Sequence, residues 1–214
     1  LGATVTGHTV AYLDGPGGTQ VPEIVIDTIA ECYRSRNSNF DGMFHTSVAV
    51  IESVNKAREA IADFLGATDP ASISFGANMT SLNFALSHAL GRGLERDDEV
   101  VITALDHEAN RGPWLKLEEH GVVVREVRMD EAGAIDMDDF ATQLNARTRI
   151  IAVTLASNAL GTVPDFAQIR EFTRNTDSYI VVDAVHYAAH FPVDVAWLDC
   201  DFLLCSAYKF YGPH

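Results

Sequence analysis

The sequence is poor in cysteine, and the three cysteines that it has exclude a disulfide framework. Cys32, Cys200 and Cys205 are odd in number, and no two of them form a C-x-x-C pair. Small secreted proteins rely on several paired cysteines, whereas cytoplasmic proteins keep their thiols reduced. We therefore expect free thiols and a cytoplasmic protein.

Positive charge is scarce as well. The chain has 15 basic residues against 30 acidic ones, and its formal net charge is −15. Nucleic acids and anionic membranes are bound through basic surfaces, so we expect neither as a partner. No apolar run reaches the roughly 18 residues that would indicate a membrane span, and the first residues lack the pattern of a signal peptide.

Two common catalytic signatures are missing. The sequence contains neither the G-x-S-x-G turn of many hydrolases nor the G-x-x-x-x-G-K-[ST] loop that binds nucleotide phosphates. A hydrolase therefore has no support in the sequence.

Short apolar runs alternate with helical patterns along the whole chain. The predicted strands lie at residues 72–75, 99–105, 122–127, 149–155, 179–184 and 201–205. Helices are predicted from Thr46 to Gly66, after Asn78, around residues 113–120 and after Asp136. Near-continuous apolar strands are typical of strands covered on both faces, which predicts an α/β fold with a mostly parallel sheet in a three-layer α/β/α arrangement.

Polar side chains follow the predicted strands, at the edge of the sheet where α/β proteins bind ligands. They are Asn78 and Thr80, His107, Asn158, Asp183 and His186, and Ser206, Tyr208 and Lys209. Each of them alone is most often a helix cap, a structural residue or a solvated side chain. Together they supply a helix start that can bind an anion, an imidazole, an amide, a carboxylate and an amine. This set suits a phosphorylated aromatic aldehyde that condenses with a lysine.

Five blocks in order carry a resemblance to a known family. They are "YLDGPGGTQVP" (12–22), "DHEANRGPW" (106–114), "SNALGT" (157–162), "DAVHYAAH" (183–190) and "SAYKFYGPH" (206–214). The chain resembles the class V aminotransferases, which are enzymes of fold type I that depend on pyridoxal 5′-phosphate, and among them the cysteine desulfurase-like branch. The resemblance spans essentially the whole chain.

The resemblance implies three catalytic residues. Lys209 would form a Schiff base with the cofactor aldehyde and then carry a proton at the substrate α-carbon. Asp183 would pair with the pyridine nitrogen and keep it protonated, so that the ring withdraws electrons. His107 would stack on the face of the ring.

The resemblance also implies the groups that hold the cofactor and the substrate. Asn158 and His186 would form hydrogen bonds on the side of the phenolic oxygen, where related desulfurases usually have glutamine in place of His186. The phosphate would be held by Asn78, the backbone of Met79, Ser206, and also Thr80 and Tyr208. Relatives commonly have hydroxyl residues at 78 and 79 and often histidine at 208. Gly17, Gly18 and Asn158 would lie against the substrate.

A metal site is a weaker interpretation of one block. Asp183, His186 and His190 read as D-x-x-H-x-x-x-H. No cysteine or glutamate completes a ligand set, and the family resemblance already uses two of the three residues. We therefore expect no metal.

In domain terms, the resemblance implies an N-terminal segment at residues 1–45, which contributes to the active site and to a dimer interface. Residues 46–214 would be an incomplete cofactor-binding large domain. Relatives continue beyond the lysine with an antiparallel strand between residues 72–75 and 201–205, then a small C-terminal domain. We therefore expect an N-terminal fragment, truncated before that domain and inactive by itself.

The predicted function is a pyridoxal phosphate-dependent enzyme that acts on an amino acid. The leading reaction is removal of sulfur from L-cysteine to give L-alanine and enzyme-bound sulfur, with a homodimer and a sulfur-acceptor protein as partners. None of the three cysteines matches the position of the desulfurase nucleophile. An aminotransferase or an epimerase of the same fold remains open, and so does a non-catalytic scaffold, although the presence of Lys209, Asp183 and His107 together speaks against the last.

Overall fold

The computed structural model describes residues 4–11 and 13–214, and the chain divides into two compact units. The first unit is formed by the residues up to Phe75 together with Ala207–His214, and the second unit by Gly76–Ser206. The predicted division at residue 45 concerns the active site and a dimer interface, and it stays a prediction.

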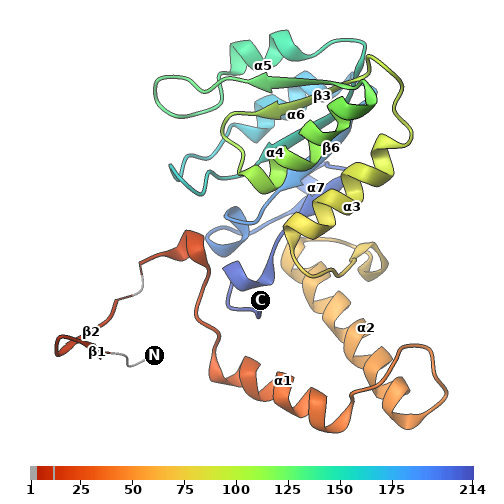
Figure 1. Ribbon diagram of the computed structural model, residues 1–214, viewed down its shortest axis with the longest axis vertical. Helices are drawn as coiled ribbons and strands as arrows, with labels where there is room; N and C mark the ends of the chain where they lie inside the picture. Colours follow the sequence, from red (N-terminus) through yellow and green to blue (C-terminus); the bar gives the residue numbers. More distant parts are fainter. Residues whose placement is uncertain (1–3, 12) are drawn as a thin grey trace. The chain divides into compact units, whose positions relative to one another are not determined.

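The second unit is built on a parallel sheet of five strands (Figure 1). These are β3 (Glu99–Thr103), β4 (Val123–Val127), β5 (Thr148–Thr154), β6 (Tyr179–Asp183) and β7 (Phe202–Leu204), in the order β4-β3-β5-β6-β7. Every neighbouring pair is parallel. The five apolar runs from residue 99 onward are thereby confirmed as strands, since four of the runs contain a strand and the run 149–155 includes all of β5 except its first residue.

Helices cover both faces of this sheet, because the central strands are apolar on both sides. Val100, Ile102, Ile150, Ala152 and Val181 form one buried cluster with residues of two helices. Those helices are α3 (Met79–Gly91) and α4 (Glu108–Leu115), which continues into the 3₁₀ turn η3 (Lys116–His120). The intervening strand residues point to the opposite face, as the period of two requires. Figure 1 shows α3 and α4 in front of the sheet and α6 (Phe166–Thr173) behind it. The three-layer α/β/α prediction is confirmed.

Each α-helix of the second unit begins at a side chain that accepts a hydrogen bond from its first turn. Asn78 caps α3 and His107 caps α4, as the predicted start after Asn78 required. The remaining caps are Asp136 for α5 (Met137–Gln143), Asp165 for α6 and Asp194 for α7 (Val195–Leu198). These caps satisfy amide groups that a helix cannot satisfy internally.

The first unit contains two long helices and little sheet. A short hairpin joins β1 (Thr4–Val5) to β2 (His8–Thr9), and the 3₁₀ turn η1 (Gly15–Gly17) follows. The helices are α1 (Glu23–Ser35) and α2 (His45–Leu65), and the 3₁₀ turns η2 (Pro70–Ser72) and η5 (Ala207–Lys209) complete the unit. The predicted helix that ends at Gly66 is confirmed, since Gly66 takes the left-handed conformation, with φ of 70°, that terminates α2.

The predicted strand at residues 72–75 is wrong. Ser72 ends the turn η2, which Pro70 opens and which Asp69 caps by accepting a hydrogen bond from the amide of Ala71 at 2.8 Å. Ile73 has extended backbone, with φ of −85° and ψ of 122°, but no described strand pairs with it. A β-strand requires a hydrogen-bonded neighbour, so extended backbone alone does not make one.

No helix in residues 4–11 and 13–214 combines the length and the apolar character that crossing a bilayer requires.

Candidate functional site

The parallel sheet of the second unit gathers the predicted polar residues at one edge. His107 follows β3, Asn158 follows β5, and Ser206 follows β7, while Asp183 is the last residue of β6. Strands that run in the same direction end at the same edge, so these four side chains share it. The chain order therefore predicted that these four residues lie at the ends of strands of one sheet, whereas Asn78 and Thr80 follow extended backbone that no described strand pairs with.

The start of helix α3 joins two of the residues expected to hold a phosphate. The amide of Met79 donates a hydrogen bond to the hydroxyl oxygen of Ser206 at 2.9 Å, and both residues are buried. Asn78 caps the same helix by accepting from the amide of Ser81 at 2.9 Å. Thr80 is exposed in the first turn, where amide groups have no intrahelical acceptor. The positive end of α3, the amide groups of its first turn and the hydroxyl of Ser206 therefore lie together. These are the kinds of group that bind an anion in proteins.

Asp183 is a buried carboxylate, with only 4% of its surface exposed. Its Oδ1 accepts a hydrogen bond from the amide of Val185 at 2.8 Å, which fixes the direction of the side chain. A buried carboxylate at a strand end has the chemistry that a protonated ring nitrogen needs as its partner. Beyond it, the turn that carries Asn158 is closed by Ser157, whose hydroxyl accepts from the amide of Leu160 at 3.2 Å.

The imidazole of His107 is exposed and oriented by its own helix. Its Nδ1 accepts a hydrogen bond from the amide of Ala109 at 3.0 Å, which leaves Nε2 to carry the proton of the neutral ring. His186 is half-buried, and its ring meets that of His190 edge to face at 4.8 Å. Within residues 4–11 and 13–214, no three histidine, cysteine, aspartate or glutamate side chains are placed to hold a metal ion.

A buried polar network beneath His107 was not identified from the sequence. Asp106 accepts hydrogen bonds from the amide and the hydroxyl of Thr103 at 2.9 and 2.8 Å, and from the side chain of Asn110 at 3.1 Å. The Asn110 oxygen in turn accepts from Asn83 of helix α3 at 3.1 Å. Burial raises the pKa of Asp106 to about 6 against these donors. The spacing of four between Asp106 and Asn110 was visible in the sequence, but the link to Asn83 depends on the tertiary fold.

The two cysteines beside β7 are poor nucleophiles. Burial raises the pKa of the Cys205 thiol to about 11, and the charge of Asp183 adds to the rise. Burial likewise raises the pKa of Cys200 to about 11. Since the thiolate is the reactive form, both half-buried thiols stay protonated and unreactive at neutral pH.

The remaining predicted residues lie together in the first unit, although they are almost 200 positions apart in the chain. The side-chain amine of Lys209 donates a hydrogen bond to the carbonyl of Pro16, within the "GPGGT" block. The carbonyl of Tyr208 accepts from the amide of Thr19 at 2.9 Å. Gly18 has φ of 123°, and a Cβ there would lie 3.2 Å from the Tyr208 ring, so only glycine suits this contact. Gly17 precedes it in the same turn.

The predicted site residues thus form one group in each unit. Lys209, Tyr208, Gly17 and Gly18 belong to the first unit. The second unit holds Asn78, Met79, Thr80, His107, Asn158, Asp183, His186 and Ser206.

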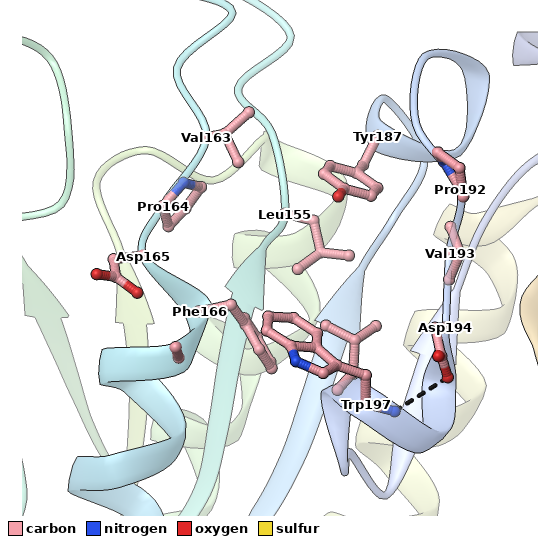
Figure 2. Close-up of a pocket in the computed structure, with 12 residues that line it drawn as sticks. Leu155, Val163, Pro164, Asp165, Phe166, Tyr187, Pro192, Val193, Asp194 and Trp197 are labelled. Carbon is pink, nitrogen blue, oxygen red and sulfur yellow. Dashed lines mark hydrogen bonds between the residues drawn. The ribbon is translucent and has the colours of Figure 1, made fainter.

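A separate cavity of about 480 Å³ lies between β5, α6 and α7 (Figure 2). Leu155, Phe166, Tyr187 and Trp197 line it with apolar surface, and none of the predicted site residues does. Its two carboxylates, Asp165 and Asp194, are helix caps that accept from the amides of Gln168 at 3.1 Å and of Trp197 at 3.0 Å. The cavity therefore carries no group arranged for acid–base or covalent chemistry.

Comparison with known proteins identifies relatives over the whole chain. The family model for class-V aminotransferases matches residues 11–214. A cysteine desulfurase of Pectobacterium atrosepticum is 36% identical over 216 residues, which cover 100% of this chain and 53% of that protein. A probable cysteine desulfurase of Mycolicibacterium paratuberculosis is 34% identical over 216 residues, with 100% of this chain and 32% of that protein covered. The chain therefore spans about a third to a half of the length of these relatives.

Solved structures show the same similarity. The cysteine desulfurase CsdA of Escherichia coli superposes with a TM-score of 0.83 at 28% identity, over 94% of this chain and 51% of that one. The apo cysteine desulfurase of Thermococcus onnurineus superposes with a TM-score of 0.88 at 28% identity, over 95% of this chain and 51% of that one.

Proposed function

This chain belongs to the class-V aminotransferase family, and on that premise we propose that it binds pyridoxal 5′-phosphate and takes part in a reaction of an amino acid. The observation that carries the proposal is the edge of the parallel sheet. There the buried carboxylate of Asp183 ends β6, and Ser206 follows β7 and accepts a hydrogen bond from the amide of Met79 at the start of α3.

The residues of the second unit fit this cofactor in charge and in hydrogen-bonding character. Asp183 would hold the proton on the pyridine nitrogen, because a buried carboxylate favours a cation beside it. Met79, Ser206 and the cap residue Asn78 would hold the phosphate, and Thr80 would add a hydroxyl group. Tyr208, which belongs to the first unit, would add another. His107 would stack on the ring with its Nδ1 engaged by Ala109. Asn158 and His186 would bind the side of the phenolic oxygen.

Lys209 would supply the covalent bond. Its side-chain amine is the group of this chain that would react with the cofactor aldehyde and so hold the cofactor covalently. When bound, the cofactor supplies a ring that accepts electrons from the substrate α-carbon. The amine of Lys209 would also move a proton to or from that carbon.

L-cysteine is the proposed substrate, because the relatives in sequence and in structure are cysteine desulfurases. In that reaction the C–S bond of cysteine breaks, alanine forms, and the sulfur passes to a thiol as a persulfide. Neither Cys200 nor Cys205 suits as that thiol, since the pKa of each is raised to about 11. A homodimer, a sulfur-acceptor protein and a cytoplasmic location belong to the same proposal.

An aminotransferase or epimerase reaction is the second candidate. His186 stands where related desulfurases usually have glutamine, and Tyr208 stands where they often have histidine. The imidazole of His186 would offer the phenolic oxygen of the cofactor a different hydrogen-bonding group from the amide of a glutamine. Such a difference would alter the electron distribution in the ring, on which the choice of reaction depends.

The test is an absorbance titration of the purified protein with pyridoxal phosphate. We expect a yellow band that borohydride bleaches, with covalent retention of the cofactor on the peptide containing Lys209. Lys209→Ala should abolish both, and Lys116→Ala, on the exposed surface of η3, should change neither. A protein that stays colourless and unlabelled refutes the proposal. Alanine formation from cysteine, measured alongside, distinguishes desulfuration from the second candidate.

A further inference from the structure

The turn that carries Lys209 is tight and strained. The carbonyl of Ala207 accepts hydrogen bonds from the amides of Phe210 at 3.0 Å and of Gly212 at 2.8 Å. Tyr211, between them, has φ of 69°, in the left-handed region that bulky residues rarely adopt. Such a conformation persists only where surrounding contacts hold it. The structure must therefore contain a contact that stabilises Tyr211.

Thr19 provides that contact. Its hydroxyl oxygen accepts a hydrogen bond from the amide of Tyr211 at 2.6 Å. The same hydroxyl donates to the carbonyl of Tyr208 at 3.1 Å, and the Thr19 amide donates to that carbonyl at 2.9 Å. A hydroxyl group can donate and accept at once, so one side chain engages peptide groups on both sides of Lys209.

We propose that Thr19 is a positioning residue for Lys209, which sets the direction of the lysine side chain by fixing the peptide groups of Tyr208 and Tyr211. The consequence for the amine rests on the proposed function, whereas the hydrogen bonds themselves do not. The side chain of Lys209 leaves the turn between the two fixed groups, and its amine reaches the carbonyl of Pro16 in the same block as Thr19. Within the "GPGGT" block, Thr19 therefore binds the backbone of the lysine turn, and the carbonyl of Pro16 binds the amine of Lys209.

Two substitutions separate the hydroxyl from the shape of the side chain. Thr19→Val keeps the size and the backbone amide but removes both hydroxyl bonds, while Thr19→Ser keeps the hydroxyl. Thr28→Val is the matched control, because Thr28 is an exposed residue of α1 whose hydroxyl also bonds a backbone carbonyl, that of Ile24 at 2.6 Å.

The first measurement is amide hydrogen exchange in the protein without cofactor. Loss of one hydrogen bond at Tyr211 should speed exchange of its amide about fivefold to tenfold in Thr19→Val. Thr19→Ser and Thr28→Val should leave that exchange unchanged. Unchanged exchange in Thr19→Val would refute the contact, whatever the protein does with the cofactor.

The second measurement is the rate at which Lys209 captures pyridoxal phosphate, trapped with borohydride and followed by mass. We expect Thr19→Val to slow capture about tenfold, and Thr19→Ser to restore at least half of the rate. If Thr19→Val exchanges faster but captures the cofactor at the normal rate, Thr19 is only structural and the proposal fails. If the unsubstituted protein captures none, the proposed function fails, and the same exchange data still decide whether Thr19 holds the turn.

Discussion

The two units of this chain are stabilised in different ways. In the second unit the central strands are covered on both faces, and Val100, Ile150 and Val181 are completely buried. In the first unit α1 has no buried residue along its whole length, and α2 buries only Ser47, Ala62 and Leu65. Folding free energy from apolar burial is therefore concentrated in the second unit.

The first turns of the α-helices are also better stabilised in the second unit than in the first. Every α-helix of the second unit begins at a side chain that caps it, whereas Pro22 and Phe44 open α1 and α2 without a side-chain capping bond. Helices without caps or burial are marginal in water. The comparison teaches that the sheet edge with the candidate site residues is held by its own unit, while the lysine turn depends on specific contacts such as those of Thr19.

Large apolar side chains remain exposed on the first unit. They include Ile24, Tyr33, Met43 and Phe44, with 75%, 71%, 97% and 72% of their surfaces exposed. Apolar surface of this kind commonly marks a protein–protein interface. It supports the proposal that residues 1–45 contribute to the interface of a homodimer.

The largest predicted contrast is in hydrogen exchange of the two units. Amides of β5 should exchange only on global unfolding, because both faces of the strand are buried. Amides of α1 should exchange by local opening, about 10³-fold faster or more. Mass spectrometry of peptides from residues 23–35 and 148–154 measures the ratio. Equal protection in the purified monomer would contradict the comparison.

The second prediction concerns one side chain from each unit. Trp114 is fully buried in the cluster between α3, α4 and the sheet, so Trp114→Ala should lower the free energy of unfolding by about 3–5 kcal/mol. Tyr33→Ala, on the exposed face of α1, should change it by about 0.5 kcal/mol or less. Denaturant titration of both variants tests this pair, and similar losses would show that α1 is covered.

The contrast also explains what the sequence could and could not predict. The strands of the second unit were predictable because burial on both faces leaves near-continuous apolar runs, such as residues 149–155. The stretch 72–75, "SISF", also has a strand-like apolar pattern, but among the described residues no strand pairs with it, which a local pattern does not reveal. Asp183 was predicted at a strand end from local order alone. The bonds of Thr19 to residues 208 and 211 join distant segments, so no local pattern could indicate them.

Glu99, the first residue of β3, allows the contribution of an ion pair to the second unit to be tested. This buried residue forms a hydrogen-bonded ion pair with Arg125 and accepts from Asn145 at 2.7 Å. Because Arg125 is partly exposed and can be solvated, Glu99→Gln should cost about 2 kcal/mol rather than the larger loss of a fully buried pair. Glu119→Gln, at an exposed pair with Lys116, should leave the unfolding midpoint unchanged.

The pH dependence of that loss has a definite sign. The hydrogen bond from Arg125 lowers the pKa of Glu99 below its usual 4.5. The stabilisation is therefore complete above the unfolded-state pKa and is lost as the pH falls through the folded-state value. The difference between Glu99→Gln and the unsubstituted protein should shrink between pH 5 and about pH 3. A constant difference would assign the loss to packing.

Substitution of Asp106 should cause a smaller loss of stability, and a second substitution should restore part of it. Asp106→Asn places an amide NH₂ group against the NH₂ group of Asn110, so that two donors face each other. If Asn110 and Asn83 turn their amides over to avoid this, Asn83 loses its 3.0 Å hydrogen bond to the carbonyl of Ala109. We expect a loss of about 1–2 kcal/mol. In the double variant with Asn110→Asp every donor again meets an acceptor, so at least half of the loss should return. No recovery would mean that the network does not depend on hydrogen-bond polarity.

Asp106 should also show the opposite pH dependence to Glu99. Its folded-state pKa of about 6 lies above the usual 3.8, so the folded protein binds this proton more tightly. Its contribution to stability is complete below the unfolded-state pKa and is lost as the pH rises through about 6. In Asp106→Asn the stability curve should lack this decline, and denaturant midpoints between pH 4 and 7 measure it.

The smallest predicted effect comes from giving α2 of the first unit a side-chain cap, as the α-helices of the second unit have. Phe44 precedes α2 with φ of −80° and ψ of 152°, the extended backbone of a capping residue, but its side chain cannot accept a hydrogen bond. Phe44→Asp supplies a carboxylate to the amides of the first turn and to the positive helix end, which should stabilise α2 by about 0.5–1 kcal/mol.

Phe44→Ala is the control, because it removes the exposed ring without adding an acceptor. Exchange of the first-turn amides should slow about twofold to fivefold in Phe44→Asp relative to Phe44→Ala. If the two variants exchange alike, the missing cap is not what distinguishes α2 from the helices of the second unit, and its exposed surface alone would account for the difference.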